Sequence, residues 1–354
     1  MERIDIKSSL YDYSVEFTNN FSEKISEFED KLTFVIDRNV YNLYKEKFSA
    51  IDETDIFFVD AEEKYKNMDT VMDILCFWQK QKVKKNWKVL CFGGGITQDV
   101  TTIAANLYLR NIEWYFFPTT LLSMCDSCIG GKCGINFNGY KNQIGVFYPP
   151  KKIIIDTVFI DTLSNDDYLN GWGELLKFSL TSDAEFFNDL KKEECFIPCK
   201  NIDKYIYKGL FVKKEIIEED EFEHDLRRVL NYGHTFGHAL EAYTSNLIPH
   251  GKGVIWGIDV VNYISFKEGL ISKDYYLEIK ELIKKYFLKD EIVIDDPKSL
   301  FEIIKTDKKV KNNTIFLALL NDYSKLIVYP KEINDNLEKE FEDYLETTHE
   351  YYCN

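Results

Sequence analysis

The stretch Trp87-Lys-Val-Leu-Cys-Phe-Gly-Gly-Gly-Ile-Thr97 decides the fold of the N-terminal half. A β-rich run ends here at three glycines, and a helical pattern begins near Thr97 and continues to Leu109. Glycines let a backbone approach a phosphate closely, and the free N–H groups at a helix start bind anions. The stretch therefore predicts a nucleotide-binding β–α turn, although Gln98 stands where the dinucleotide fingerprint has its last glycine. A tight turn without a ligand is the alternative.

Short β-rich runs alternate with helical spacing on both sides of this turn. Such alternation is typical of βαβ units and predicts a mostly parallel sheet with helices on its faces. The β-rich runs cover residues 32–37, 56–60, 87–92, 114–117 and 152–156, and the helical stretches include 68–82 and 97–109.

From about Ser164 onward, long amphipathic stretches replace this alternation and predict a helical domain. We therefore expect an α/β domain over residues 1–160 and a helical domain over 161–354. Two late β-rich runs, 314–320 and 325–329, are expected to form a hairpin with its turn near Asn321-Asp322. The helical stretches are 167–181, 183–192, 202–219, 226–243, 253–268 and 275–286.

Composition and charge exclude several classes of protein. The 354 residues are 45% hydrophobic and 15% aromatic, enough for a packed core, and the net charge of −16 repels nucleic acid. No apolar run is long enough to span a membrane, and residues 1–17 contain no secretory signal, so we expect a cytoplasmic protein. The eight cysteines are expected to be free thiols, because a cytosolic chain of this length does not need disulfides. The Cys125, Cys128 and Cys133 cluster lacks a second ligand pair at zinc-finger spacing, which argues against a metal site there.

Residues 118–145 combine glycines, lysines and asparagines and contain few acids. Glycines beside Lys132, followed by the pair Lys141-Asn142, predict a flexible and cationic surface suited to phosphate. A solvated loop with ordinary lysines is the alternative.

Histidines are rare in this chain, and three of the five lie close together in the sequence. His234 and His238 are four residues apart on one helical face, a spacing that suits two ligands of one metal ion. The spacing leaves Glu241, His250 and a distant carboxylate such as Glu174 open as the third ligand. Histidines satisfied within the core are the alternative.

Together these motifs resemble the 3-dehydroquinate synthase family from about Asp37 to Lys309. The resemblance implies a Rossmann-like NAD-binding α/β domain, a helical metal-binding domain, a homodimer, and a catalytic divalent metal ion, zinc in the first place or cobalt. The motifs are Gly93-Gly-Gly95 with Asp99, Pro118-Thr-Thr-Leu-Leu122, Asp126-Ser-x-Ile-Gly-Gly-Lys132, Lys141-Asn142-x-Ile-Gly145, Glu174-x-x-Lys177, Lys213, Asp220-Glu, Leu226-Arg227-x-x-Leu230-Asn231-x-Gly-His234-Thr-Phe-Gly-His238 and His250-Gly251.

The resemblance also implies a role for individual residues. It assigns Glu174, His234 and His250 to the metal, which makes His238 a substrate phosphate contact. Further phosphate contacts are Lys132, Asn142, Lys308 or Lys309, and Arg110 from the partner subunit. Substrate hydroxyls and ring are assigned to Asp126, Lys141, Lys177 and Asn231, and the substrate carboxylate to Lys213 and Arg227. The NAD contacts are Asp37, Asn39, Glu63, Lys66, Gly94, Gly95, Asp99, Thr119, Thr120, Leu122, Lys132 and Lys141, with Thr162 and Leu163 closing the site.

The substrate of that family is 3-deoxy-arabino-heptulosonate 7-phosphate, and the product is 3-dehydroquinate of the shikimate pathway. The reaction comprises transient oxidation by NAD, phosphate elimination, reduction, ring opening and aldol closure. Seven residues depart from the family pattern while the mapped catalytic groups remain: Gln98, Cys128, Cys133, Trp172, Gly173, Phe222 and Lys252. The alternatives are a related sugar phosphate cyclase, a metal-dependent dehydrogenase of the glycerol dehydrogenase type, and a non-enzymatic NAD-binding protein.

Overall fold

The computed structural model describes residues 3–182, 184–193, 199–245, 247–286, 292, 294–306 and 310–352. The chain folds into two compact units. The first contains residues 1–171 and 201–222, and the second contains 172–200 and 223–354. This division falls later than the expected boundary at residue 160, and it places the helix at 202–219 with the first unit. The domain limits of 1–160 and 161–354 therefore stay a prediction.

The first unit is built on a seven-stranded sheet with the strand order β1-β2-β9-β6-β5-β3-β4. Only β1 and β2 are antiparallel to each other, and the other neighbouring strands are parallel, as the βαβ pattern predicts. The strands are β1 (Arg3–Ile6), β2 (Tyr13–Thr18), β3 (Leu32–Asp37), β4 (Ile56–Val59), β5 (Lys88–Gly93), β6 (Trp114–Pro118) and β9 (Lys152–Asp156).

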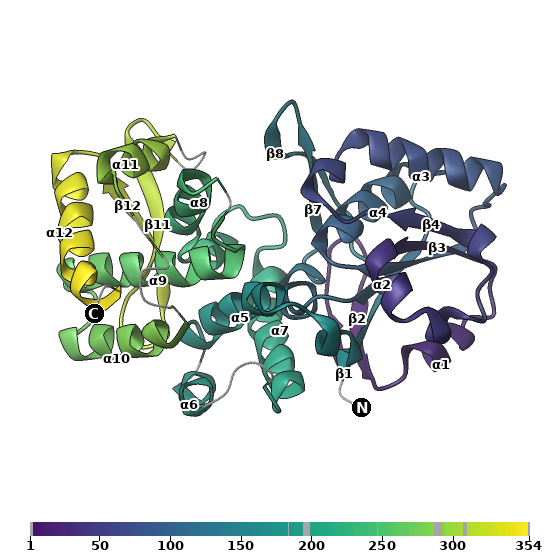
Figure 1. Ribbon diagram of the computed structural model, residues 1–354, viewed down its shortest axis with the longest axis horizontal. Helices are drawn as coiled ribbons and strands as arrows, with labels where there is room; N and C mark the ends of the chain where they lie inside the picture. The colour runs from purple at the N-terminus through teal and green to yellow at the C-terminus, as the bar shows by residue number, and fades with distance from the viewer. Residues whose placement is uncertain are drawn as a thin grey trace. The chain divides into compact units, whose positions relative to one another are not determined.

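Helices cover this sheet, and the buried apolar side chains of its central strands form the core. Figure 1 shows α3 above β3 and β4, and α1 and α2 below these two strands. The helices of this unit are α1 (Phe21–Ser26), α2 (Arg38–Leu43), α3 (Met68–Lys80), α4 (Gly95–Leu107) and α7 (Ile202–Glu219), and α5 (Asn165–Leu180) starts here and continues into the second unit.

Lys132 and Lys141 lie on an antiparallel hairpin of β7 (Lys132–Phe137) and β8 (Tyr140–Phe147), a regular element that the prediction of a flexible cationic surface did not include. Phe137 pairs with Tyr140, which leaves a two-residue turn at Asn138-Gly139. Both turn residues have positive φ, 50° and 80°, and Asn-Gly is the strongest sequence signal for such a turn. A shift of register between Ile135 and Phe137 follows the turn, and beyond it Lys132 pairs with Phe147.

The second unit is mostly helical, as predicted, and contains a three-stranded antiparallel sheet of β10 (Val310–Lys311), β11 (Thr314–Leu320) and β12 (Leu326–Glu332). β11 and β12 confirm the expected late hairpin. The helices are the continuation of α5, α6 (Ala184–Lys192), α8 (His234–Tyr243), α9 (His250–Lys267), α10 (Lys273–Ile283), α11 (Pro297–Lys305) and α12 (Asp335–Tyr352).

Glycines bring α8 and α9 into unusually close contact. A Cβ atom on Gly257 would lie 1.9 Å from the carbonyl oxygen of Gly233, and one on Gly237 would lie 2.7 Å from that of Gly253. Gly233 also has a φ of 77°, which ends the 3₁₀ turn before it and starts α8. The single helix expected over 226–243 is therefore two elements, and the glycines let the start of α8, which carries His234, pack directly against the middle of α9.

Candidate functional site

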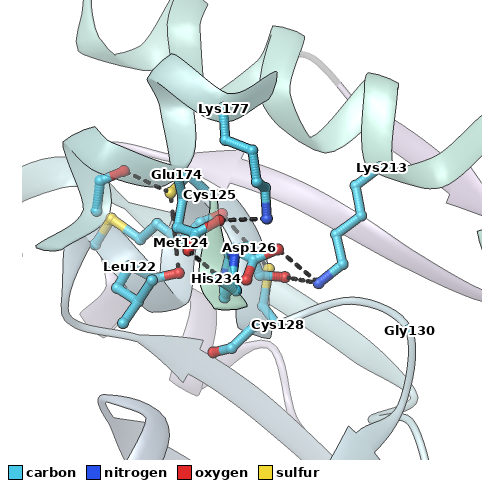
Figure 2. A network of polar contacts seen from close by, with 12 residues as sticks. Leu122, Met124, Cys125, Asp126, Cys128, Gly130, Glu174, Lys177, Lys213 and His234 are labelled. Atoms are coloured by element: carbon cyan, nitrogen blue, oxygen red, sulfur yellow. Dashed lines mark hydrogen bonds and ion pairs between the residues drawn. The ribbon is translucent and has the colours of Figure 1, made fainter. Parts of the chain in front are cut away.

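A buried carboxylate in the second unit faces two histidines. Glu174 lies on α5 and is fully buried. Its Oε1 atom is 3.2 Å from His234 Nε2 and 3.4 Å from His250 Nε2. Its Oε2 atom forms an ion pair with Lys177, one turn further along the helix, and Figure 2 shows the Lys177 ammonium pointing toward Glu174. The residues that resemblance assigns to a metal ion thus come together from three helices.

The second nitrogen of each histidine has a different partner. His234 Nδ1 is 3.0 Å from the backbone carbonyl oxygen of Tyr232, and His250 Nδ1 is 2.8 Å from Glu241 Oε1. Both rings therefore direct Nε2 toward Glu174. Glu241, which spacing left open as a third ligand, lies against the opposite nitrogen of His250.

The charges of this cluster favour a cation. Burial alone would raise the pKa of Glu174, but Lys177 and His234 lower it well below its usual range, so the carboxylate is ionised. Burial alone would lower the pKa of His250, yet the nearby carboxylates of Glu174 and Glu241 raise it to about 10. In the absence of a metal ion, a proton on His250 thus neutralises part of the negative charge.

The donor set fits a divalent ion such as zinc. Two imidazole nitrogens and one carboxylate oxygen are the three protein ligands of many catalytic zinc sites, which keep one position open. Neither oxygen of the buried Glu174 meets hydrogen-bond geometry with a described residue, although the ion-pair partners are near. His238 is exposed and offers a nitrogen within 4.8 Å of donor atoms of His234 and His250.

The positions assigned to NAD lie at the carboxyl ends of adjacent strands in the first unit. Asp37 ends β3, Gly94 follows β5, and Thr119 follows β6. The chain leaves β3 toward β4 on one side and continues from β5 to β6 on the other, so this is a topological switch point, where open α/β sheets bind their ligands. A Cβ atom on Gly95 would meet nothing within 4 Å, which leaves open space at the start of α4.

Near the nucleotide turn at Gly94-Gly95, several side chains hold one another in place through ion pairs and hydrogen bonds. Lys66 forms an ion pair with Asp99 at 2.7 Å and donates a hydrogen bond to Asn142 Oδ1 at 2.8 Å. Asn136 donates to Glu63 at 2.8 Å. Burial raises the pKa of Asp99 to about 6, although Lys66 opposes the shift. The hairpin is thereby tied to the nucleotide turn.

Asp126 lies on a single π-helical turn, Ser123–Ser127, within the first unit. Lys213 from α7 reaches its carboxylate at 2.8 Å and its carbonyl oxygen at 2.6 Å, as Figure 2 shows. The side chain of Gln98 holds the same turn, because it donates to the carbonyl oxygen of Ser127 and accepts from the Ser127 hydroxyl. Single π-turns are frequent at functional sites.

The other assigned residues are distributed as follows. Arg227 is buried, and Asn231 donates a hydrogen bond to Glu223 at 3.2 Å. Thr162 lies 3.1 Å from the Tyr44 hydroxyl at the end of a 3₁₀ turn. Arg110 is exposed on a turn of three successive residues with positive φ.

Lys308 and Lys309 lie outside the described residues. Asn39, Lys132 and Lys141 are exposed, Gly94 is buried, and Thr120, Leu122 and Leu163 are half-buried.

Most departures from the family pattern have local structural roles. Gly173 allows α5 to approach α9, since a Cβ atom there would lie 2.6 Å from the carbonyl oxygen of Gly251. Phe222 makes an edge contact with Phe147. Cys128 and Cys133 are buried free thiols, and burial raises the pKa of each to about 12. Lys252 is buried as well.

The chain combines an α/β unit that has a nucleotide turn with a helical unit that has a Glu–His cluster. This combination is typical of enzymes that use NAD and a metal ion. Residues 56–170 match the family model of the 3-dehydroquinate synthase N-terminal domain, and residues 171–310 match that of the C-terminal domain. The chain therefore belongs to the 3-dehydroquinate synthase family and is an enzyme of the sugar phosphate cyclase type.

Individual relatives agree with this assignment. The chain is 36% identical to the 3-dehydroquinate synthase of Dictyoglomus turgidum, over 96% of this chain and 98% of the relative. It resembles the solved 2-epi-5-epi-valiolone synthase of Streptomyces hygroscopicus, which holds NAD+ and Zn2+, with a TM-score of 0.82 at 25% identity, over 97% and 98% of the two chains. A 2-deoxy-scyllo-inosose synthase complexed with carbaglucose-6-phosphate, NAD+ and Co2+ shares the fold, with a TM-score of 0.84 at 22% identity, over 97% and 100%.

None of the helices in the described part of the chain is long and apolar enough to cross a membrane.

Proposed function

We propose that this chain is a 3-dehydroquinate synthase that converts 3-deoxy-arabino-heptulosonate 7-phosphate to 3-dehydroquinate and phosphate. The observation that carries the proposal is the meeting of Glu174, His234 and His250 in a chain that matches both domains of the family. The matched relatives support this substrate, since the Dictyoglomus turgidum enzyme covers nearly the whole chain. The predicted cytoplasmic location stays a prediction.

When bound, NAD supplies a hydride acceptor, and a divalent ion supplies a Lewis acid for the alcohol that is oxidised. The nucleotide turn at Gly94-Gly95 would hold NAD, and Glu174, His234 and His250 would hold the metal ion. Lys177 keeps Glu174 ionised, so that its carboxylate is available as a ligand. Lys132, Asn142 and His238 would bind the substrate phosphate, and the substrate carboxylate would pair with Arg227, whose planar guanidinium suits a carboxylate with two parallel hydrogen bonds.

Phosphate release from the heptulosonate tests this proposal directly. The wild type is expected to release phosphate with no net accumulation of NADH, because the hydride is returned in each turnover. A chelator should stop the release, and added zinc or cobalt should restore it. Steady growth of NADH absorbance with turnover would favour the dehydrogenase alternative instead.

Arg227 tests which sugar phosphate is the substrate. Replacing it by Met should weaken use of the heptulosonate by about 2 kcal/mol or more of charged hydrogen bonding. Activity should be compared on sedoheptulose 7-phosphate, which has no carboxylate. A wild type that prefers this second sugar would make the chain a related cyclase.

We also infer a homodimer in which Arg110 serves the partner subunit's site. Two observations support this. Arg110 is exposed, and Lys85 fixes the turn that carries it by donating hydrogen bonds to the carbonyl oxygens of residues 109–111. Arg110→Ala and Glu174→Ala variants should each be nearly inactive. Equal mixing should make about half the dimers mixed, each with one intact site, and restore about a quarter of the wild-type rate. No recovery in exchanged dimers would remove Arg110 from the partner's site.

A further inference from the structure

The two histidines that face Glu174 differ in what holds their other nitrogen. For His234 the partner of Nδ1 is a neutral backbone carbonyl, that of Tyr232 at 3.0 Å. For His250 it is the carboxylate of Glu241 at 2.8 Å, from the neighbouring helix. Only the second partner is a side chain, and only that one carries a charge.

Each partner decides which ring nitrogen carries the hydrogen. An acceptor beside Nδ1 draws the hydrogen there and leaves the lone pair of Nε2 free for a metal ion. A carboxylate accepts a stronger hydrogen bond than a carbonyl and makes the far nitrogen a better electron donor. The orientation and basicity of His250 should therefore depend on the side chain of Glu241. The Nδ1 atom of His234 is held by a backbone carbonyl instead.

The packing of α8 against α9 holds Glu241 in this position. Its side chain is only 12% exposed, and a Cβ atom on Gly253 would lie 3.2 Å from Glu241 Oε1 and 3.3 Å from its Cγ. The absence of a side chain at residue 253 gives Glu241 the room to lie along α9 and reach the ring of His250. The contact is thus built into the helix interface.

We propose that Glu241 is a positioning residue of the cation site, which fixes His250 with Nε2 toward Glu174 and strengthens its binding of a divalent ion. The inference rests on the proposed function, because it concerns the same metal site. Glu241 itself is not a ligand in this arrangement. It faces the nitrogen of His250 that points away from Glu174.

The test is the affinity for Zn2+, measured by competition with a chromophoric chelator on the full chain. Glu241→Ala should weaken zinc binding by about 10- to 100-fold. Glu241→Gln, which keeps the size and one accepting oxygen but loses the charge, should weaken it less. Glu302→Gln is the matched control, because Glu302 loses the same charge in the same unit but is exposed and pairs only with Lys305 among the described residues.

Two further measurements separate positioning from a loss of structure. The absorption spectrum of bound Co2+ should change in both Glu241 variants and not in Glu302→Gln, since it reports the ligand geometry. Thermal unfolding of the metal-free Glu241→Gln protein should match the wild type. If Glu241→Gln binds zinc and absorbs with cobalt like the control, the proposal is overturned.

The same zinc-binding measurements distinguish a failure of the proposed function from a failure of the role of Glu241. If Glu174→Ala and His250→Ala lose zinc while Glu241→Gln and Glu241→Ala bind it normally, the metal site stands and the role of Glu241 falls. If the wild type itself binds neither zinc nor cobalt, the metal site and the role of Glu241 both fall.

Discussion

Two buried carboxylates in the helical unit, Glu174 and Asp259, look alike in burial and charge but differ in their surroundings. Both are fully buried beside a buried lysine. Asp259 Oδ2 accepts a hydrogen bond from the Tyr344 hydroxyl at 3.0 Å and lies 3.5 Å from the Lys280 ammonium. Glu174 instead faces two histidines whose side chains are 13% and 28% exposed.

The difference shows what distinguishes a ligand site from a structural ion pair. The partners of Asp259 are buried, and Lys280 also donates to the Tyr276 hydroxyl at 2.8 Å and lies against the rings of Tyr276 and Tyr344. Burial lowers the pKa of Lys280, although Asp259 opposes the shift. Of these two clusters, only that of Glu174 has histidines and solvent-accessible side chains among its described partners. A buried acid beside a lysine is therefore not sufficient evidence for function.

The largest expected effect is the loss of activity in Glu174→Gln. Gln keeps the shape of the side chain but provides a poor ligand and no charge. Phosphate release should fall to the level of chelator-treated wild type, and zinc affinity should fall with it. Asp259→Asn is the matched control, with the same chemical change at a buried carboxylate, and its zinc affinity should equal that of the wild type. Equal losses of zinc affinity in the two variants would erase the distinction between the clusters.

Asp259→Asn should instead act on stability. It leaves the buried ammonium of Lys280 without its counter-charge, which typically costs about 3–5 kcal/mol. The free energy of unfolding, measured in urea on the metal-free protein, should fall by this amount. A change below about 1 kcal/mol would mean that Lys280 is neutralised in another way.

Gly257→Ala is expected to affect both properties. The added methyl group would collide with the carbonyl oxygen of Gly233 and push α8 away from α9. Overpacking of this kind costs about 1–3 kcal/mol of stability. Because the two helices carry His234 and His250, zinc affinity should fall in the same variant. A loss of stability with unchanged zinc affinity would show that the cluster tolerates movement of its helices.

The sequence predicted elements best where one local pattern sufficed. The five β-rich runs from Leu32 to Asp156 became β3, β4, β5, β6 and β9, and the late hairpin formed as expected. The hairpin of β7 and β8 was missed, although Asn138-Gly139 is a strong local signal that could have revealed it. The break at Gly233 was missed because the apolar spacing continues through it, while its positive φ interrupts the helix.

The site was harder to predict because its members are distant in sequence. Spacing on α8 paired His234 with His238, but it left Glu174, Glu241 and His250 open, and only the packing of α5 against α8 and α9 orders them. Spacing alone gave no indication that Tyr232 would contribute its backbone carbonyl or that Gly173 and Gly253 would provide space. These contributions come from backbone atoms and from absent side chains, so no pattern of residue types reveals them.

The smallest expected effect is that of the double variant Asp259→Asn, Lys280→Met. Replacing a whole buried ion pair by neutral groups of similar volume is often close to neutral, because the cost of burying both charges disappears together with their attraction. The double variant should therefore lie within about 1–2 kcal/mol of the wild type in free energy of unfolding, although Asp259→Asn alone loses more. The parallel change at the other cluster, Glu174→Gln with Lys177→Met, should not restore zinc binding, since the ligand is still absent. If instead the Asp259 double variant were as unstable as the sum of its single variants, the hydrogen bonds of Asp259 and Lys280 to Tyr344 and Tyr276 would carry that stability, rather than the pairing of charges.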